Sequence, residues 1–175
     1  IPQDHKEVSY VRGVKIPVIK RAEALGMTSR DSRAIAVAGT HGKTSTSSLI
    51  TQLLKAGRAA FSAFVGGIML DSDSNYLSQC NEWVVLEADE YDRSFLHLNP
   101  QIAILLSMDP DHLDIYDDHE KMKEGFWEFI MRINSGGTLI YAHRLEALFP
   151  EDWKHQLRAN EIRYASFGIE EGNIK

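Results

Sequence analysis

Short apolar runs alternate with longer amphipathic stretches along most of the chain. Apolar runs bounded by polar or glycine-rich segments are typical of buried strands, and apolar residues three and four positions apart are typical of helices. The sequence therefore predicts strands over 34–38, 59–65, 83–86, 102–108, 138–142 and 162–167. It predicts helices over 21–27, 46–56, 120–134 and 153–160. This alternation predicts an α/β fold, in which helices cover both faces of a mostly parallel sheet.

The apolar positions of two predicted helices indicate which side of each faces the core. In the helix over 46–56 these positions are Leu49, Ile50, Leu53 and Leu54. In the helix over 120–134 they are Met122, Phe126, Phe129, Ile130 and Ile133. We expect Tyr91 and Trp127 to be packing residues rather than residues that stack on a base.

The segments between these elements carry turn residues. Gly66-Gly67 is expected to end the strand over 59–65, and the polar stretch 71–81 is expected to form a surface loop. The polar stretch 28–33 is expected to be a linker. Because the chain begins at Ile1 and ends just after a predicted strand, we interpret it as a piece of a longer protein. Residues 1–33 would then be the tail of a preceding domain with its linker, and residues 34–175 one truncated domain.

Composition narrows the class of protein. The 175 residues suffice for one domain with a full core, and 43% hydrophobic and 25% charged residues are ordinary for a globular protein. The net charge is −6 without a lysine–arginine block, which argues against nucleic-acid binding. No apolar run approaches the roughly 20 residues that span a bilayer. The single cysteine, Cys80, has no partner for an internal disulfide, which fits a reducing cytoplasm and no specific role for this thiol.

A glycine-rich segment lies between the strand over 34–38 and the helix over 46–56. It comprises Gly39, Thr40, His41, Gly42, Lys43, Thr44 and Ser45. A strand, a glycine turn and a helix start in this order are the context of a phosphate-binding loop, because backbone N–H groups and the positive end of the helix dipole converge on an anion. Lys43 can reach outer phosphates, and the Thr44 hydroxyl can bind the accompanying magnesium ion.

This segment departs from the strict phosphate-loop pattern at one position. The glycine expected five residues before Gly42 is replaced by Val37, so Gly-x-x-Gly-Lys-Thr remains. The alternative interpretation is a structural glycine turn, with an exposed lysine and threonines that cap the helix.

Polar clusters follow two further predicted strands. Glu87, Asp89 and Glu90 follow the strand over 83–86, and Asp111 and His112 follow the strand over 102–108. Since the carboxyl ends of parallel strands share one edge of a sheet, these residues could converge with Lys43 and Thr44.

Such a set of residues could bind divalent metal ions. Thr44 and Glu87 would supply oxygen ligands to magnesium. His112 could hold a second divalent ion, for which a histidine ligand favours manganese or less strictly bound magnesium. The alternatives are a solvated acidic loop at 87–90 and a histidine that caps the next segment or bonds to Asp114. His97, His119, His143 and His155 lack comparable partners and are expected to be structural or exposed.

Three segments together resemble the Mur ligases, the ATP-dependent enzymes that form amide bonds in peptidoglycan synthesis. They are Gly39 to Thr44, Glu87-Ala88-Asp89-Glu90 and Asp111-His112-Leu113-Asp114. His41 is similar to the alanine-adding and murein-tripeptide-adding branches. The alanine-adding branch is resembled more closely by Phe95-Leu96-His97-Leu98 and by the segment from Asp111 to Tyr116. The resemblance covers most of 34–142, and 1–30 resembles the end of the family's UDP-binding first domain.

The resemblance implies a bacterial, cytoplasmic ligase fragment that belongs to a P-loop-type central domain. ATP would phosphorylate the lactyl carboxylate of UDP-N-acetylmuramate, and the amine of L-alanine would attack the acyl phosphate. By motif position, Lys43, Glu87 and His112 would be catalytic, with Thr44, Glu87 and His112 as ligands of Mg²⁺ or Mn²⁺. The alternatives are the tripeptide-adding enzyme of cell-wall recycling and a nucleotide-binding module without turnover.

Two departures from the family limit what the resemblance implies. Several members use a carbamylated lysine about fifteen residues after the metal-binding histidine, where this chain has Trp127. The adenine-contacting motif and the C-terminal domain of the family would lie beyond Lys175, so we expect the isolated piece to be inactive as a ligase.

Overall fold

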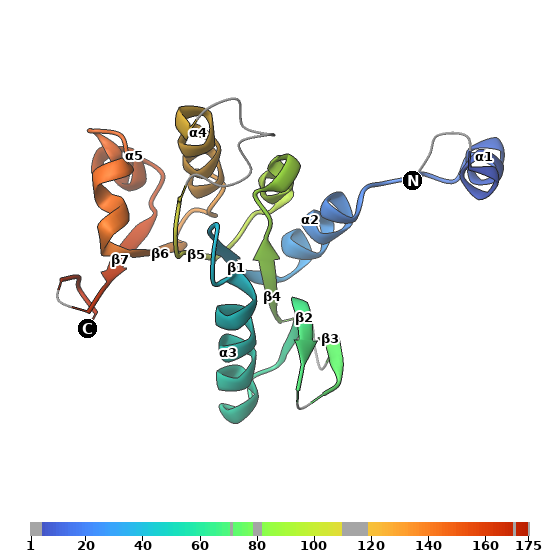
Figure 1. The fold of residues 1–175 in the computed structure, drawn as a ribbon, viewed down its shortest axis with the longest axis horizontal. Helices are drawn as coiled ribbons and strands as arrows, with labels where there is room; N and C mark the ends of the chain where they lie inside the picture. The colour runs from blue at the N-terminus through green and yellow to red at the C-terminus, as the bar shows by residue number, and fades with distance from the viewer. Residues whose placement is uncertain (1–4, 71, 79–81, 110–118, 170, 175) are drawn as a thin grey trace.

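The structure is a computed structural model that describes residues 5–70, 72–78, 82–109, 119–169 and 171–174 (Figure 1). Its strands are β1 (Arg33–Ala38), β2 (Phe61–Met69), β3 (Ser74–Ser78), β4 (Trp83–Ala88), β5 (Ile102–Leu105), β6 (Thr138–Ala142) and β7 (Arg163–Phe167). Its helices are α1 (Lys6–Gly13), α2 (Arg21–Asp31), α3 (Lys43–Ala56), α4 (His119–Ile130) and α5 (Trp153–Ala159), with the 3₁₀ helices η1 (Tyr91–His97) and η2 (His143–Leu148).

The described strands form a seven-stranded sheet in the order β3-β2-β4-β1-β5-β6-β7. Each neighbouring pair is parallel except β2 and β3, which are antiparallel. Figure 1 shows α3 on one side of the sheet and α4 and α5 on the other. The prediction of a mostly parallel sheet between two helical layers is therefore confirmed.

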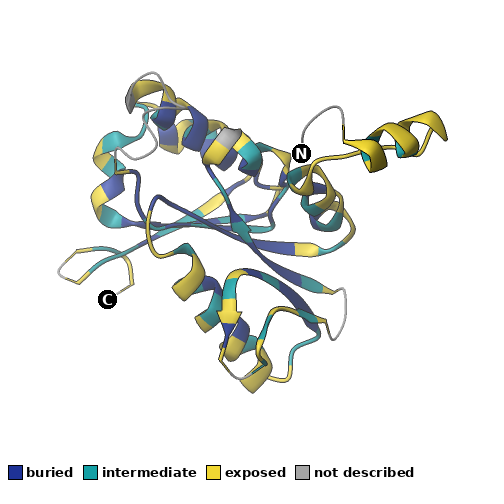
Figure 2. Ribbon diagram, turned by 45° about the vertical axis from the view of Figure 1, so that its right-hand side comes forward, coloured by how far each residue is buried: buried dark blue, intermediate teal, exposed yellow. Residues whose placement is uncertain are grey.

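The core lies on both faces of the central strands (Figure 2). Ala34, Ala36 and Ala38 of β1 are fully buried, because β1 is the middle strand and has neighbours on every side. On the α4 side, Phe95 of η1 stacks on Phe129 and meets Phe126 edge to face. The aromatic stripe predicted for the helix over 120–134 is thus confirmed as core, although α4 itself ends at Ile130.

The side of α3 that faces the sheet differs from the prediction. Ser47 and Thr51 are buried, and Ile50 and Leu54 pack against the smaller core cluster. Leu49 and Leu53 are 65% and 72% exposed, so their assignment to the core face was wrong. The helix turns its hydroxyl side inward because Ser47 Oγ lies 3.0 Å from Glu87 Oε1 at the end of β4.

Several predicted boundaries also change. β2 continues through Gly66-Gly67 to Met69, and its register with β3 shifts between Phe64 and Met69, so the glycines mark an irregularity rather than an end. Ser74–Ser78 within the predicted loop over 71–81 forms β3, which pairs with β2. Thr28–Asp31 belongs to α2 rather than to a linker, since Ser29 is buried and its hydroxyl accepts a hydrogen bond from the Asn99 N–H.

The strand predicted over 102–108 ends at Leu105, because the next residues turn toward the glycine-rich segment. At the other end of the chain, α1 lies away from the sheet and none of its residues is buried (Figures 1 and 2). Among the described residues, no helix is long and apolar enough to cross a membrane.

Candidate functional site

The glycine-rich segment connects the end of β1 to the start of α3, as the sequence predicted. Gly39 and Gly42 have φ values of +137° and +83°, which residues with a Cβ rarely adopt. A Cβ on Gly39 would also lie 2.9 Å from the backbone nitrogen of Ser107. The two glycines therefore permit both the turn and its close approach to the end of β5. We call residues 39–44 the phosphate loop.

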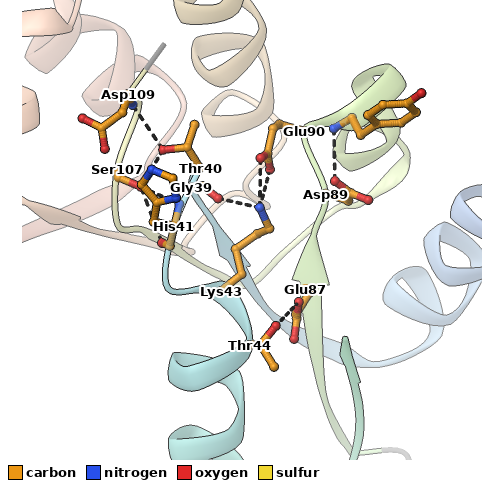
Figure 3. A network of polar contacts seen from close by, with 11 residues as sticks. Gly39, Thr40, His41, Lys43, Thr44, Glu87, Asp89, Glu90, Ser107 and Asp109 are labelled. Carbon is orange, nitrogen blue, oxygen red and sulfur yellow. Dashed lines mark hydrogen bonds and ion pairs between the residues drawn. The ribbon is translucent and has the colours of Figure 1, made fainter. Parts of the chain in front are cut away.

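The ammonium group of Lys43 points back into this loop and across to the segment after β4 (Figure 3). Its Nζ lies 2.7 Å from the Gly39 carbonyl oxygen and 2.9 and 2.8 Å from the two carboxylate oxygens of Glu90. Glu90 is 1% exposed, so the interpretation of 87–90 as a solvated acidic loop is wrong for this residue. The sequence analysis did not identify Glu90 as the partner of Lys43.

Glu87 faces the first turn of α3 instead. The Thr44 hydroxyl donates to Glu87 Oε2 at 3.1 Å, and the backbone N–H of Gly66 donates to Oε1 at 2.6 Å. Two oxygen ligands that the sequence assigned to a divalent cation are therefore neighbours (Figure 3). This donor set fits magnesium, which takes one or two protein oxygens and completes its shell with phosphate and water.

A second network holds the loop from the side of β5. Ser107, which is 2% exposed, places its hydroxyl 2.9 Å from Thr40 Oγ1 and accepts the His41 N–H at 2.9 Å. The Asp109 N–H donates to Thr40 Oγ1 at 3.2 Å. The sequence analysis missed Ser107, although a hydroxyl inside the apolar run over 102–108 is a signal that could have identified it.

A pocket of about 490 Å³ opens beside these groups. Lys43, Glu87 and Asp89 line one part of it, while α2 and the β2–β3 pair contribute Arg21 and Tyr76. Positive and negative groups therefore share one cavity at the carboxyl edge of the sheet, where open α/β sheets bind ligands.

The remaining predicted residues have different outcomes. His112, Asp111, Asp114 and Cys80 lie outside the described residues, so the proposed second metal ligand stays a prediction. Among the residues that the structure does describe, no three His, Cys, Asp or Glu side chains gather as a metal site.

The aromatic residues and histidines are described in part. Trp127 packs against the core, as expected, and its Nε1 also donates to Gln156. Tyr91 is 52% exposed beside a smaller pocket and is not the packing residue that we expected. His97 and His155 are exposed, and His143 Nε2 lies 3.2 Å from Glu171.

One hydrogen-bonded pair lies away from this site, between buried Tyr141 of β6 and partly exposed Glu146 of η2. Tyr141 Oη donates to Glu146 Oε2 at 2.8 Å. Burial and this hydrogen bond raise the pKa of Tyr141. Burial also acts to raise the pKa of Glu146, but the hydrogen bonds from Tyr141 and Lys154 outweigh it and leave that pKa below its ordinary value.

Comparison with known proteins places these features in a family. The Mur ligase middle domain matches residues 37–175. A UDP-N-acetylmuramate–L-alanine ligase of Porphyromonas gingivalis is 49% identical over 141 residues, which cover 80% of this chain and 31% of that protein. The corresponding ligase of Christiangramia forsetii is 45% identical over 145 residues, with 83% and 32% covered. The chain thus spans about a third of the length of these curated relatives.

Solved structures agree on the fold. UDP-N-acetylmuramate:L-alanyl-gamma-D-glutamyl-meso-diaminopimelate ligase from Neisseria meningitides superposes with a TM-score of 0.76 at 24% identity, covering 98% of this chain and 57% of that one. UDP-N-acetylmuramate-alanine ligase from Thermotoga maritima gives 0.70 at 24% identity, covering 98% and 37%. A MurF ligase from the same organism, in complex with ADP, gives 0.62 at 21% identity, covering 89% and 38%. Because the family match covers most of the chain, the chain belongs to the Mur ligases and contains their middle domain.

Proposed function

We propose that this chain is the ATP-binding part of a UDP-N-acetylmuramate–L-alanine ligase. The observation that carries the proposal is the contact of Thr44 with Glu87 at the start of α3, next to Lys43, in a chain 42–49% identical to curated ligases of that name. Because the chain spans about a third of those relatives, the activity is proposed for a ligase that contains this chain.

In the proposed reaction, the phosphate loop holds the ATP phosphates with its N–H groups. Lys43 orients the outer phosphates. Thr44 and Glu87 would hold Mg²⁺, with Mn²⁺ as the alternative ion, and the ion when bound offsets charge on the transferring phosphoryl group. His112 is proposed as a ligand of a second ion. The pocket beside Lys43 is where we place the carboxylate that receives the phosphoryl group.

The chemistry has two balanced steps. A carboxylate oxygen of UDP-N-acetylmuramate bonds to the γ-phosphorus, and the bond from that phosphorus to ADP breaks. The amine of L-alanine then bonds to the acyl carbon and loses a proton, while the acyl C–O bond breaks and releases phosphate. Phosphorylation matters because a free carboxylate is a poor electrophile, and phosphate is a far better leaving group than oxide.

The proposed domain organisation assigns 1–33 to the end of a UDP-binding domain and its connection, and 34–175 to the ATP-binding domain. None of the residues of α1 is buried here, which supports this division, whereas α2 packs against the ATP-binding part through Ser29. We propose that the reaction takes place in the bacterial cytoplasm, where UDP-activated substrates and ATP are available. We propose no nucleic-acid partner, since the net charge is −6.

Two other functions remain as alternatives. One is the tripeptide-adding ligase. The Neisseria meningitides ligase joins UDP-N-acetylmuramate to a tripeptide according to its name, and its TM-score of 0.76 reflects the shared fold alone. A binding module without turnover is disfavoured by the acidic run over 87–90 together with Asp111 and His112, because nucleotide binding alone needs no second set of metal ligands.

The test is ADP release by a ligase that contains this chain, with UDP-N-acetylmuramate as acceptor. We expect release with L-alanine, little with L-alanyl-γ-D-glutamyl-meso-diaminopimelate, and a large loss in Glu87→Ala and His112→Ala. Release with the tripeptide alone would assign the recycling enzyme. Unchanged metal-dependent release in both variants would overturn the proposed metal ligands.

A further inference from the structure

Lys43 has no hydrogen left for a nucleotide in this structure. An ammonium group has three N–H donors. The three acceptors of Lys43 are the Gly39 carbonyl oxygen and both Glu90 carboxylate oxygens, all within 2.9 Å of Nζ. A phosphate that binds Lys43 must therefore replace one of these three acceptors.

Glu90 is held in place more firmly than the lysine. Its side chain is 1% exposed, whereas that of Lys43 is 18% exposed. The Glu90 carbonyl oxygen accepts the Arg93 N–H at 3.0 Å in the turn that begins η1. Two residues later in that helix, Phe95 is fully buried against α4. The carboxylate consequently stays next to the phosphate loop, and adjustment falls to the longer and more exposed lysine.

Glu90 also brings a negative charge to a loop suited to anions. In a partly desolvated site, a carboxylate beside a lysine satisfies the cation in the way a phosphate oxygen would. We propose that Glu90 is an internal counter-anion, which occupies Lys43 while the loop is empty and competes with nucleotide phosphate for it. This inference rests on the proposed function of the loop, and assigns to Glu90 a positioning role that sets phosphate affinity.

The proposal predicts that removing the charge of Glu90 increases the affinity for phosphate, which a purely structural ion pair does not predict. Glu90→Gln keeps the size and one carbonyl oxygen but removes the charge. If Glu90 competes with phosphate, the variant binds phosphate-bearing ligands more tightly, by about tenfold if one charge-assisted hydrogen bond is at stake. If Glu90 serves stability alone, the variant melts at a lower temperature and its affinity for the ligand does not improve.

The experiment is calorimetric titration of ATP, and separately of tripolyphosphate, into the chain without magnesium, so that the contribution of Thr44 and Glu87 is left out. Glu128→Gln is the matched control, because it removes the same charge from a carboxylate that pairs with Arg93 and Arg132 on the surface. Tighter binding of both ligands by Glu90→Gln alone, including binding that the parent chain lacks, supports the proposal. Equal, weaker or absent binding in Glu90→Gln overturns it.

A second measurement needs no variant and therefore no assumption about folding. Amine acetylation followed by mass spectrometry compares Lys43 with Lys123, whose side chain is similarly exposed at 23% but pairs with one oxygen of the exposed Glu120. We expect Lys43 in the unliganded chain to react at least about fivefold more slowly, because all its hydrogens are bonded. Equal rates would overturn the proposal.

The two proposals fail in different ways. If Lys43→Ala abolishes ATP binding while Glu90→Gln leaves it unchanged, only the counter-anion role fails. If Lys43→Ala leaves ATP binding unchanged, the phosphate loop itself is not the nucleotide site.

Discussion

Gly66 is the position at which a single methyl group should reveal the role of Glu87. A Cβ built there lies 2.6 Å from Glu87 Oε2, so the carboxylate has to retreat by about 0.8 Å to reach the 3.4 Å of ordinary contact. That movement disturbs the 2.6 Å hydrogen bond from the Gly66 N–H and shifts the carboxylate that Thr44 contacts at 3.1 Å. Gly66→Ala therefore disturbs the proposed metal ligands without changing either of them.

Two magnitudes follow for Gly66→Ala. A hydrogen bond to a charged group contributes about 1.5–3 kcal/mol, and partial exposure of this one reduces the expected loss to about 1 kcal/mol. For a domain of this size the melting temperature should fall by roughly 3 °C. Loss of a group that orients a metal ligand costs about 10-fold to 100-fold in metal affinity, so the gain in ATP affinity on adding magnesium should shrink by at least about tenfold.

The assay is ATP titration with and without magnesium, beside thermal unfolding. Gly13→Ala is the control, because a Cβ at Gly13 meets nothing within 4 Å. If Gly66→Ala retained the full magnesium dependence of the parent chain, Glu87 would not be the ligand we propose.

Three further predictions concern the Ser107 network, the corrected face of α3 and the Tyr141–Glu146 pair. Ser107→Ala should lower the free energy of unfolding in urea by about 2 kcal/mol, because it leaves buried loop groups unpaired, and a loss below about 0.5 kcal/mol would contradict the network. Leu53→Ala should cost less than about 0.5 kcal/mol and Leu157→Ala about 2–5 kcal/mol, since their side chains are 72% and 0% exposed, and equal losses would refute the corrected face of α3. Because the pKa of Glu146 is lowered in the folded chain, its stabilising contribution is present above the unfolded-state pKa and is lost as the pH falls through the folded-state pKa. Tyr141→Phe removes one cause of that lowering, so its loss of stability should be smaller at pH 3 than at pH 7, and the same loss at both would refute the assignment.

The sequence was sufficient for the sheet and the phosphate loop because both depend on local signals. The apolar runs delimit the strands of the parallel part of the sheet, and two glycines before Lys43 mark the turn. Glu87 and Thr44 could be paired from sequence because Glu87 lies at the end of one strand and Thr44 follows another at the same edge of the sheet.

The partners that depend on tertiary geometry could not be predicted in this way. Glu87 and Glu90 lie in one acidic run, and which of them meets Lys43 is decided by the turn that begins η1. Four aliphatic residues on α3 suggested one core face, but the contact of Ser47 with Glu87 turns a hydroxyl face inward and leaves Leu53 exposed. The predicted role of His112 stays a prediction, because this residue lies outside the described part of the chain.

The most direct test of the nucleotide site is calorimetric titration of ATP with magnesium into the parent chain, Lys43→Ala and Lys55→Ala. Lys55→Ala is the control, because it removes the same charge from the last turn of the same helix. Lys55 lies roughly 18 Å from Lys43 at 1.5 Å per residue. We expect binding that requires magnesium, is lost in Lys43→Ala and is retained in Lys55→Ala. Binding that Lys43→Ala leaves unchanged would contradict the account, because the loop between β1 and α3 would then not hold the phosphates.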